Sequence, residues 1–595
     1  MVRLGAAMIE PLARDSAARI LSWTHEGSKW RTPLALAAHG EAFPAPDGFL
    51  ALSRVALSGR PTVLAGGSRF RPAAGAAWLS LDDDIPYSPA GGAELQAAGH
   101  AENVAAHQNG RAFVLVDPAG SIPDDVEVVA LANARAYVDN PFTMAKALTT
   151  ARTNVGPERL LYLPGCGLPQ EIALLAYCGV DIFDDAAAVL AARQGSYLTP
   201  EGALPDPGET DLVAHARAEV QREIKRVHLA INAGKLRELV EQRCGATPTL
   251  AAHLRRLDKE AYDFFDARAP SIRPGRLYAT SKGSLERPEV ERFRRRLASR
   301  YRKPSSARIL VLLPCSAKKP YSESKTHRIL GSALERVRNR FAIHEVVLTS
   351  PLGVVPRELE RCYPAAHYDL PVTGHWDEDE KLMIRDALAA LVSTSRYDAI
   401  VVHLDEVEVE IAAPVLGDFH YTVEKDPLSH ESLDNLAAML NKLGDAVPRV
   451  GWVQRALDDL SSLARFQFGE PGHVLVEGAD IKGRAPFLRL VDHDSGLQLA
   501  MLVPDRGYLS LAPEGGKRLL EAGGPKVEID DFRPKGTVFA VGVRSGDVGI
   551  VPEDDVILTH DGEFRGVGRA LAPGVDMARM KKGPCVAVRH KEGGA

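Results

Sequence analysis

The chain contains few cysteines and few aromatic residues for its length. Its 595 residues include 6 cysteines, and aromatic residues make up 6%. The cysteines are scattered and form neither a CxxC pair nor a Cys/His spacing that suits zinc. A chain of this length does not need disulfides to stabilise its core. The pattern argues against a disulfide framework and a metal site, and it predicts reduced thiols in a cytoplasmic protein.

Long apolar runs and a strong excess of one charge are also absent. No stretch approaches the roughly 18 apolar residues needed to cross a bilayer, and the opening MVRLGAAMIEPLARDSAARI lacks the apolar core of a signal peptide. The 72 basic and 78 acidic residues give a net charge of −6. We therefore expect no membrane role. A nucleic-acid partner is neither required nor excluded, because local patches govern such binding.

The length predicts several domains, since 595 residues are too many for one hydrophobic core. Residues 1–275 alternate short apolar runs, such as FVLV (113–116) and VVAL (128–131), with helix-like segments. This alternation predicts an α/β layer or barrel. Residues 450–522 form a small mixed region that links to the C-terminal part. In residues 523–592, short apolar runs alternate with glycine turns, which predicts a small β-barrel.

Residues 280–447 show a βαβ rhythm, in which apolar runs such as ILVLL (309–313) alternate with helix-like segments at 326–340 and 380–394. This rhythm predicts a parallel sheet, whose ligands bind beyond the carboxyl ends of the strands. Three polar loops have that location: PCSAKKPYSESKTH (314–327), SPLGVVPRELE (350–360) and YDLPVTGHWDEDE (368–380).

The loop at 314–327 concentrates a thiol, hydroxyls, lysines, a phenol and an imidazole at a strand end. Taken singly, each side chain has a structural explanation: a buried cysteine packs as a small hydrophobe, serines bond to turn amides, and Thr326 suits a helix N-cap. Taken together, they indicate a functional site. The candidate catalytic residues are Cys315, Ser316, Lys319, Tyr321, Ser324 and His327.

The segment RFRRRLASRYRK (292–303) carries seven basic residues and no acidic residue. Its apolar positions recur at helical spacing, which predicts an amphipathic helix with an exposed basic face. The alternative is a surface that contacts phosphates.

The segment 527–589 resembles a PUA domain, an RNA-binding module. The turn GVRSGD (542–547), the pairing DDVILTHDGEFRGVGRA (554–570) and the closing KKGPCVAVRH carry the resemblance. It implies that the basic edge of this barrel contacts RNA. The candidate RNA-binding residues are Arg569, Arg579, Lys581, Lys582 and Arg589.

The stretch LLYLPGCGLPQEIALLAYCGVDIFDDAAAVLAARQG (160–195), followed by HLAINAGKLRELV (228–240), resembles a tRNA-guanine transglycosylase barrel. In that family the aspartate aligned with Asp184 attacks the ribose. The family's clustered zinc cysteines have no equivalent between Gly202 and His228, and its second functional aspartate has no match. These departures favour a degenerate barrel kept for folding or tRNA docking, with Asp184 as a vestigial nucleophile.

The loop at 314–327 matches the pattern PC-x3-KPY-x2-S-x2-H, and with it the chain resembles the archaeosine synthases. The domain order also resembles that family, so the resemblance covers nearly the whole chain. It implies an enzyme that acts on tRNA carrying 7-cyano-7-deazaguanine (preQ0) in the D-loop and converts the nitrile toward the amidine of archaeosine. It further implies lysine as the amine donor, a separate radical-SAM partner and an archaeal source. No cofactor is expected from the sequence. The oligomeric state stays open, a homodimer included.

Amine addition to a nitrile gives the loop residues candidate roles. Cys315 could attack first and form a thioimidate, its pKa lowered by Lys318, Lys319 or His327, or lysine could add directly. His327 is a candidate proton shuttle, and Tyr321 or Ser324 a candidate donor to the nitrile nitrogen.

The other two loops and the next strand end supply candidates for substrate binding. Arg357 and Glu358 could hold the donor's carboxylate and ammonium, or form a structural ion pair. Thr373 and Gly374 could line a base pocket or make a turn. Asp405 could bind an amine, whereas the alternating glutamates after it are expected to face solvent. With Lys318, these are the candidate substrate-binding residues.

Two rival functions remain at this point. A working transglycosylase would use Asp184 to form a glycosyl–enzyme bond, and the missing zinc ligands argue against it. A noncatalytic tRNA-binding subunit would not need the polar groups at 315–327.

Overall fold

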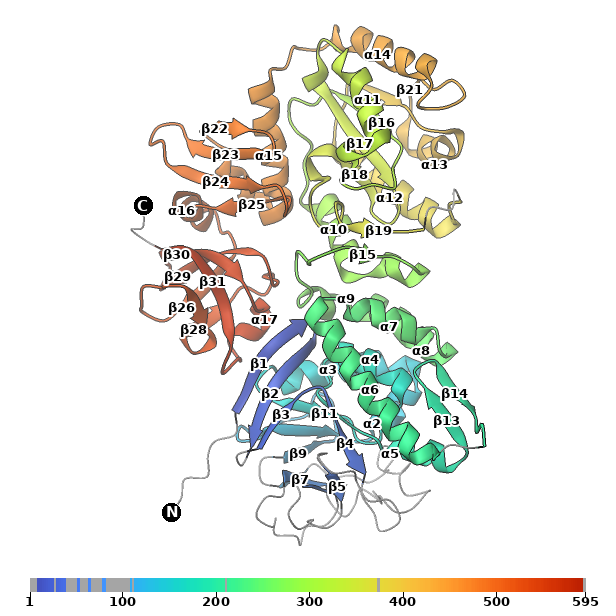
Figure 1. Cartoon of the computed structure of the whole chain (residues 1–595). Coiled ribbons are helices and arrows are strands. Elements are labelled where there is room, and N and C mark those ends of the chain that lie inside the picture. Colours follow the sequence, from blue (N-terminus) through green and yellow to red (C-terminus); the bar gives the residue numbers. More distant parts are fainter. Residues whose placement is uncertain are drawn as a thin grey trace. The chain divides into compact units, whose positions relative to one another are not determined.

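The computed structural model describes residues 8–25, 28–38, 112–208, 211–371 and 375–591, together with short strands at 51–53, 62–65, 77–81 and 107–109. The chain divides into two compact units (Figure 1). Unit 1 comprises Met1–Ala269 with the short segments Phe539–Val541 and Asp576–Pro584, and unit 2 comprises Pro270–Val538, Gly542–Val575 and Cys585–Ala595. Among the described helices, none is both long enough and apolar enough to cross a membrane.

Unit 1 is built on a nine-stranded sheet in the order β7-β6-β5-β4-β12-β11-β10-β9-β8. All neighbours pair in parallel except β8 and β9, which confirms the predicted barrel-like α/β arrangement. The strands are β4 (Leu34–Ala38), β5 (Ala51–Ser53), β6 (Thr62–Ala65), β7 (Ala77–Leu81), β8 (His107–Asn109), β9 (Ala112–Leu115), β10 (Val128–Leu131), β11 (Leu160–Tyr162) and β12 (Ile182–Asp184). An antiparallel sheet of β1 (Met8–Asp15), β2 (Ala18–His25) and β3 (Ser28–Arg31) and a hairpin of β13 (Ser196–Thr199) and β14 (Gly202–Pro205) accompany it.

The helices of unit 1 begin at recognisable capping residues. Asn140, Asp211 and Thr247 accept hydrogen bonds from backbone N–H groups of the first turns that follow them. The described helices are α2 (Ala134–Asp139), α3 (Pro141–Val155), α4 (Pro169–Tyr177), α5 (Ala186–Arg193), α6 (Leu212–Ala233), α7 (Leu236–Cys244), α8 (Pro248–Glu260) and α9 (Tyr262–Asp266). Gly234 ends α6 in the left-handed region, at φ 63°, where a glycine has no steric cost.

The central part of unit 2 holds a five-stranded sheet in the order β18-β17-β16-β20-β21. The strands are β16 (Ile309–Leu313), β17 (Ile343–Thr349), β18 (Gly353–Pro356), β20 (Ala399–Val402) and β21 (His420–Tyr421). The predicted parallel pairing holds for β17, β16, β20 and β21. The expectation of a loop at 350–360 is wrong, because β18 folds back antiparallel to β17. Gly353 permits this at φ 80°, since a Cβ there would lie 2.5 Å from the Cβ of Ala387.

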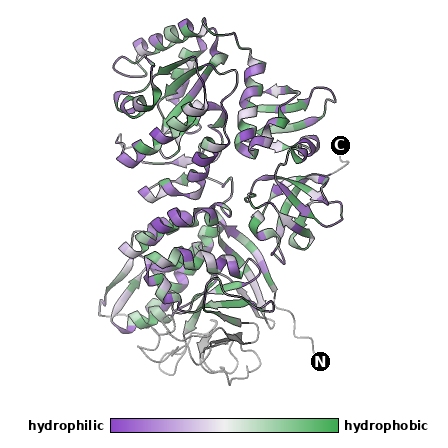
Figure 2. Ribbon diagram, turned by 180° about the vertical axis from the view of Figure 1, so that it is seen from behind, coloured by the Kyte–Doolittle hydropathy of each residue, from purple (hydrophilic) through white to green (hydrophobic). Residues whose placement is uncertain are grey.

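Five helices accompany this sheet, and all but the first begin at a residue whose side chain caps the helix. They are α10 (Pro288–Ser299), α11 (Lys325–Glu335), α12 (Glu378–Thr394), α13 (Glu406–Leu416) and α14 (His430–Gly444). The short elements are β15 (Leu277–Tyr278), β19 (Tyr368–Asp369), η1 (Lys282–Glu286), η2 (Tyr321–Glu323), η3 (Arg340–Ala342) and η4 (Arg357–Leu359). Ser324 caps α11 by accepting a hydrogen bond from the His327 N–H, so the expectation that Thr326 is the N-cap is wrong. Figure 2 shows apolar residues concentrated along the central strands, with polar residues on the outer faces of the helices.

The basic segment at 292–303 forms most of α10, but its arginines are largely held by the protein. Arg292 and Arg296 are buried, at 6% and 8% exposure. Arg294 and Arg295 both pair with Glu291. The expected exposed basic face is therefore confined to a few side chains of this helix.

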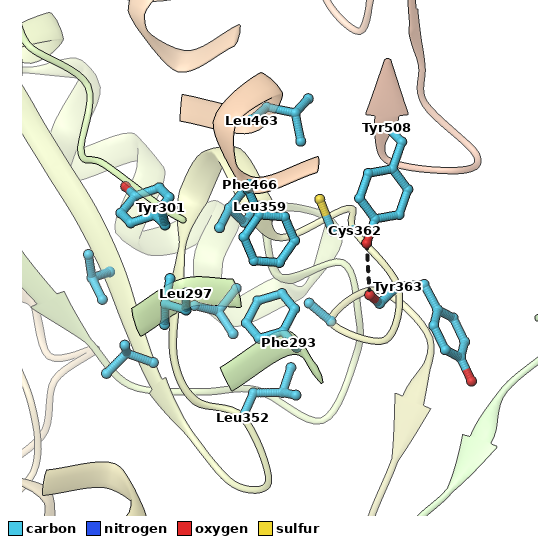
Figure 3. Packing of buried hydrophobic residues seen from close by; sticks show 14 of the residues in the cluster. Phe293, Leu297, Tyr301, Leu352, Leu359, Cys362, Tyr363, Leu463, Phe466 and Tyr508 are labelled. Atoms are coloured by element: carbon cyan, nitrogen blue, oxygen red, sulfur yellow. Dashed lines mark hydrogen bonds between the residues drawn. The ribbon is translucent and has the colours of Figure 1, made fainter. Parts of the chain in front are cut away.

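A shared core joins α10 to the linking region of unit 2. Phe293 of α10 packs on Phe466 of α15 (Trp452–Phe468), with ring centroids 5.2 Å apart (Figure 3). On the same core, the Tyr508 hydroxyl donates to the Tyr363 carbonyl at 3.3 Å. The predicted small linking region thus shares its packing with the central part.

The remaining strands of the chain form two smaller sheets. The first has the order β22-β23-β24-β25 and is contacted by α15 and by α16 (Pro513–Glu521), which both also contact η5 (Glu470–Leu475). Its strands are β22 (Ala479–Arg484), β23 (Phe487–Asp492), β24 (Gln498–Val503) and β25 (Tyr508–Leu511). The C-terminal β domain is a curled sheet in the order β27-β31-β30-β29-β26-β28. Its elements are β26 (Lys526–Ile529), β27 (Thr537–Phe539), η6 (Ala540–Gly542), β28 (Val543–Gly546), β29 (Asp555–His560), β30 (Glu563–Ala570), α17 (Gly574–Met577) and β31 (Pro584–Lys591).

Candidate active site

A pocket of about 560 Å³ lies in unit 2, beyond the carboxyl ends of β16 and β20. Its volume is typical of small-molecule sites. All three predicted polar loops contribute to it, as does the segment around η1. The lining residues are Ala279, Thr280, Ser281, Lys282, Leu285, Pro314, Cys315, Ser316, Ala317, Lys319, Thr349, Ser350, Leu370, Pro371, His375, Trp376, Asp377, Glu380, Asp405 and Glu408.

Cys315 lies half-buried in this pocket, directly after β16. Burial, followed by the nearby Glu408, raises the pKa of its thiol to about 11, while Lys319 acts in the opposite direction. Lys319 lowers this pKa as expected, but burial and Glu408 outweigh it, so the net shift is upward. With its pKa well above neutral pH, the thiol needs a base before it can act as a nucleophile.

Lys319 lines the pocket close to Cys315. Its Nζ lies 4.0 Å from the centroid of the Tyr368 ring and donates to the Ala317 carbonyl at 3.3 Å. Burial lowers the pKa of this amine, which makes its neutral form more accessible than that of a solvated lysine. Lys319 is thus the lining group best suited to accept a proton from Cys315.

The other candidates of the loop divide between the pocket wall and its support. Ser316 lines the pocket, and its hydroxyl donates to the Lys318 carbonyl at 3.0 Å. Lys318 itself is exposed and is not among the lining residues. Ser324 is buried beneath the loop as the α11 N-cap.

Tyr321 is fully buried and takes part in a triangle of hydroxyl groups. The Tyr321 hydroxyl lies 2.5 Å from the Tyr368 hydroxyl and 3.1 Å from Oγ1 of Thr349. The Tyr368 hydroxyl and Oγ1 of Thr349 are 2.6 Å apart. Only Thr349 of the three lines the pocket. Tyr321 therefore supports the pocket through Thr349 and has no direct access to it.

Both ring nitrogens of His327 are occupied within the protein. Arg357 Nη2 lies 3.0 Å from Nδ1, and Nε2 lies 3.0 Å from the Pro314 carbonyl. Because a guanidinium can only donate, Nδ1 accepts and Nε2 carries the proton. Burial and Arg357 lower the pKa of the imidazole to about 4. This geometry suits a group that holds Pro314 beside Cys315, and it does not suit a proton shuttle.

Arg357 and Glu358 lie outside the pocket lining. Arg357 pairs with Glu345 at 2.6 Å and with Glu360 at 2.7 Å. Glu358 is buried and accepts a hydrogen bond from the Tyr301 hydroxyl. Both side chains are engaged in structural ion pairs and hydrogen bonds, which is the alternative that the sequence left open. Thr373 and Gly374 lie outside the described residues.

Two carboxyl groups at the start of α13 line the pocket. Asp405 is exposed, lines the pocket and caps α13 by accepting from the Glu408 N–H at 2.8 Å. Glu408 also lines the pocket but is only 4% exposed, so the expectation that it faces solvent is wrong. Helical spacing could have identified it, because Glu408 precedes the buried Ile411 and Ala412 by three and four positions. The alternation of EVEVE suggests a solvated face and hides this spacing.

Three family models match segments of the chain. A domain of unknown function matches residues 290–440, which include the pocket loops. The queuine tRNA-ribosyltransferase family matches residues 124–219, and the PUA domain matches residues 526–591. The transglycosylase-like and PUA resemblances are thus confirmed, while the proposed boundaries at 275, 447 and 522 stay predictions.

Curated relatives match most of the chain. Archaeosine synthase subunit alpha of Methanosarcina acetivorans is 37% identical over 497 residues, which cover 77% of this chain and 77% of its own. Archaeosine synthase of Haloferax volcanii is 34% identical over 81% of this chain and 85% of its own. The chain belongs to the archaeosine synthase family. A tRNA-guanine(15) transglycosylase of Methanothermobacter thermautotrophicus is more distant, at 27% identity over 76% of this chain and 68% of its own.

In this archaeosine synthase family member, Asp184 is fully buried at the end of β12. Its carboxylate accepts hydrogen bonds from the Tyr162 hydroxyl at 2.7 Å, the Gly165 N–H at 2.8 Å and the Ala186 N–H at 3.0 Å. These hydrogen bonds lower the pKa of Asp184, but burial outweighs them and raises it overall. A carboxylate so enclosed holds the loop after β11 in place, which fits the vestigial role expected for it.

The basic residues of the PUA domain differ in how far they are already engaged. Arg569 pairs with Glu553 at 2.9 Å, Arg589 with Asp555 at 2.5 Å and, within unit 1, Arg579 with Glu158 at 2.8 Å. Lys581 and Lys582 are exposed, and no ion pair of either is found in the part of the chain that the structure describes. These two lysines are the members of the set most available to phosphate groups.

Proposed function

We propose that this chain modifies tRNA that carries preQ0 in its D-loop by adding an amine to the nitrile carbon. Lysine is the proposed donor, and the product is an amidine adduct that a radical-SAM partner converts to archaeosine. Membership of the archaeosine synthase family supports the substrate. The observation that carries the chemistry is the pocket that places Cys315, Lys319 and Glu408 around one space.

The proposed reaction needs an electrophilic carbon and a nucleophile that has lost its proton. In the covalent route, Lys319 takes the thiol proton of Cys315, and sulfur attacks the nitrile carbon as one C≡N π bond breaks. The nitrogen then takes up a proton and a thioimidate results. The neutral donor amine adds to the same carbon, the C–S bond breaks, and the proton returns to sulfur. In the direct route, the amine adds without the thioimidate and Cys315 forms part of the wall.

The PUA domain supports the proposal that the substrate is a folded RNA, because its exposed Lys581 and Lys582 can contact phosphates. The radical-SAM partner follows from the family resemblance. Some relatives bear the name "subunit alpha", which fits a second subunit.

The test combines the purified chain, preQ0-bearing tRNA and isotopically labelled lysine, followed by mass spectrometry of the nucleosides. The expected product carries the mass of lysine on the modified base with the glycosidic bond intact. A matched tRNA with guanine at the same position is the control and should remain unlabelled. Failure of the wild-type chain to attach lysine or another amine to correctly prepared tRNA would contradict the proposal.

A further inference from the structure

Glu408 is a buried carboxyl group without an assigned task. It lies on the first turn of α13, is 4% exposed and lines the pocket with Cys315. Its Oε2 atom has no hydrogen-bond partner among the described residues. Its backbone N–H is used by Asp405, but this bond leaves the carboxyl group free. A buried polar atom without a partner is costly, so its presence here indicates a ligand that supplies the partner.

The groups around Glu408 do not neutralise it. Asp405, the N-cap residue of this helix, is itself an acid, and no ion pair with Glu408 is found among the described residues. Of the lysines that line the pocket, Lys282 is held by Asp379 and Lys319 lies over the Tyr368 ring. The titratable groups that line the same pocket from its other elements are Lys282, Cys315, Lys319, His375, Asp377 and Glu380.

An isolated buried carboxylate is unfavourable, so this group favours its neutral form. Burial and then the charge of Asp405 raise the pKa of Glu408 to about 8. At neutral pH the pocket therefore offers a carboxylic acid with a proton to donate, on a helix that holds it rigidly.

Resting on the proposed function, we propose that Glu408 is the proton relay of the amine addition, donating to the nitrile nitrogen and then accepting a proton from the attacking amine. The nitrogen–carbon bond forms as one C≡N π bond breaks, and the electron pair on the nitrile nitrogen takes the carboxyl proton. The Glu408 carboxylate then takes the surplus proton of the newly bound amine. The net result is addition of N–H across the nitrile, and the carboxyl group is regenerated.

Glu408 lies near Cys315, because both residues line the same pocket. After burial, the charge of Glu408 is also the largest cause of the raised pKa of Cys315. A nitrile carbon that Cys315 can reach is thus close to a group that can protonate the adjoining nitrogen. The same relay serves the direct and the thioimidate routes, so the inference does not depend on which is used.

The test compares Glu408→Gln with Glu406→Gln, a matched change at an exposed residue on the same turn that does not line the pocket. Glu408→Gln keeps the size of a neutral side chain but cannot relay a proton. We expect its rate of adduct formation to fall by about 100-fold or more. Glu406→Gln should keep the wild-type rate.

The pH profile separates a relay from a packing role. The wild-type rate of adduct formation should decline above about pH 8 as Glu408 ionises. This alkaline limb of the pH–rate profile should be absent in Glu408→Gln. Asp405→Asn, which retains N-capping ability, should shift the limb to lower pH because it removes a negative neighbour. Unchanged rates and an unchanged limb in Glu408→Gln would overturn the inference while leaving the proposed function intact.

A second measurement does not require catalysis. Cys315 is half-buried whereas the other five cysteines are buried, so iodoacetamide should label it first in the folded chain. The pH midpoint of this labelling should fall in Glu408→Gln, because the charge that opposes the thiolate is gone. An unchanged midpoint would show that the two groups are not neighbours and would overturn the relay. If wild type forms no adduct at all, the proposed function fails, and a shifted midpoint would still establish the pairing.

Discussion

Arg357 donates to Nδ1 of His327 across 3.0 Å, and this contact fixes the imidazole in its neutral form. The ring then donates through Nε2 to the Pro314 carbonyl, one residue before Cys315. A residue that the motif marks as a candidate acid–base group thus acts as a brace for the loop. The same contact makes the histidine a source of acid sensitivity.

We predict that the free energy of unfolding depends less on pH between about 4 and 6.5 in His327→Gln than in the wild type. The pKa of His327 is lowered from its usual value near 6.5 to about 4. Because the pKa is lower in the folded state than in the unfolded state, the neutral ring gives its full contribution to the free energy of unfolding above pH 6.5. This contribution is lost as the pH falls through the folded-state pKa of about 4. The shift corresponds to roughly 3 kcal/mol at most. Urea unfolding at pH 7 and pH 4.5 measures it.

At neutral pH the same variant loses the two ring hydrogen bonds, which costs about 1–3 kcal/mol. His430→Gln is the control, because the His430 side chain is 91% exposed. The same pH slope in wild type and His327→Gln would contradict the assignment of the buried neutral ring.

Cys315→Ala distinguishes the two chemical routes. In the covalent route, we expect the lysine adduct to form at least about 100-fold more slowly, because the thioimidate is not available. Borohydride reduction or mass spectrometry of the denatured wild-type chain should then reveal substrate attached at Cys315. Cys362→Ala is the control, because that thiol is buried and donates to the Gly507 carbonyl. A near-normal rate in Cys315→Ala would establish direct addition.

The sequence predicted the scaffold better than the roles of its side chains. Strand β10 has the predicted bounds, and β16 has them too, because a fully buried parallel strand is a continuous apolar run. The region at 350–360 could not be predicted in this way. Its strand β18 depends on a glycine turn and on burial against α12, which are tertiary features.

The sequence predicted the location of the candidate site but only some of the residues that line it. Cys315, Ser316, Lys319 and Asp405 line one pocket, as a strand-end location implies. Tyr321 and His327 support the pocket from beneath, because they lie on the buried side of the segment that begins α11. The motif spacing contains no information on which side of the loop each residue faces. Glu408 was missed because the alternating EVEVE pattern suggests a solvent-facing segment, although its helical spacing to Ile411 and Ala412 places it on the buried face of α13.

We predict that the double change Lys581→Ala/Lys582→Ala weakens binding of tRNA without changing its selectivity. Removal of one lysine that binds a phosphate should reduce the slope of log K against log salt concentration by somewhat less than one, so the slope should fall by about one to two in the double variant. Arg569→Ala is the comparison, since its guanidinium is already paired with Glu553. If Arg569→Ala weakened tRNA binding more than the double change does, the prediction that Lys581 and Lys582 are the main phosphate contacts would be wrong.

We predict that Asp184→Asn leaves the chemistry of the central pocket intact. The carboxylate accepts three hydrogen bonds inside unit 1, and the asparagine amide must place its NH₂ group against one of those donors. We expect a stability loss of about 1–3 kcal/mol in thermal unfolding of the chain. Lysine adduct formation per folded molecule should remain near the wild-type value. If instead Asp184→Asn abolished a release of labelled guanine from tRNA that the wild type performs, the barrel would be a working transglycosylase and the vestigial role would be wrong.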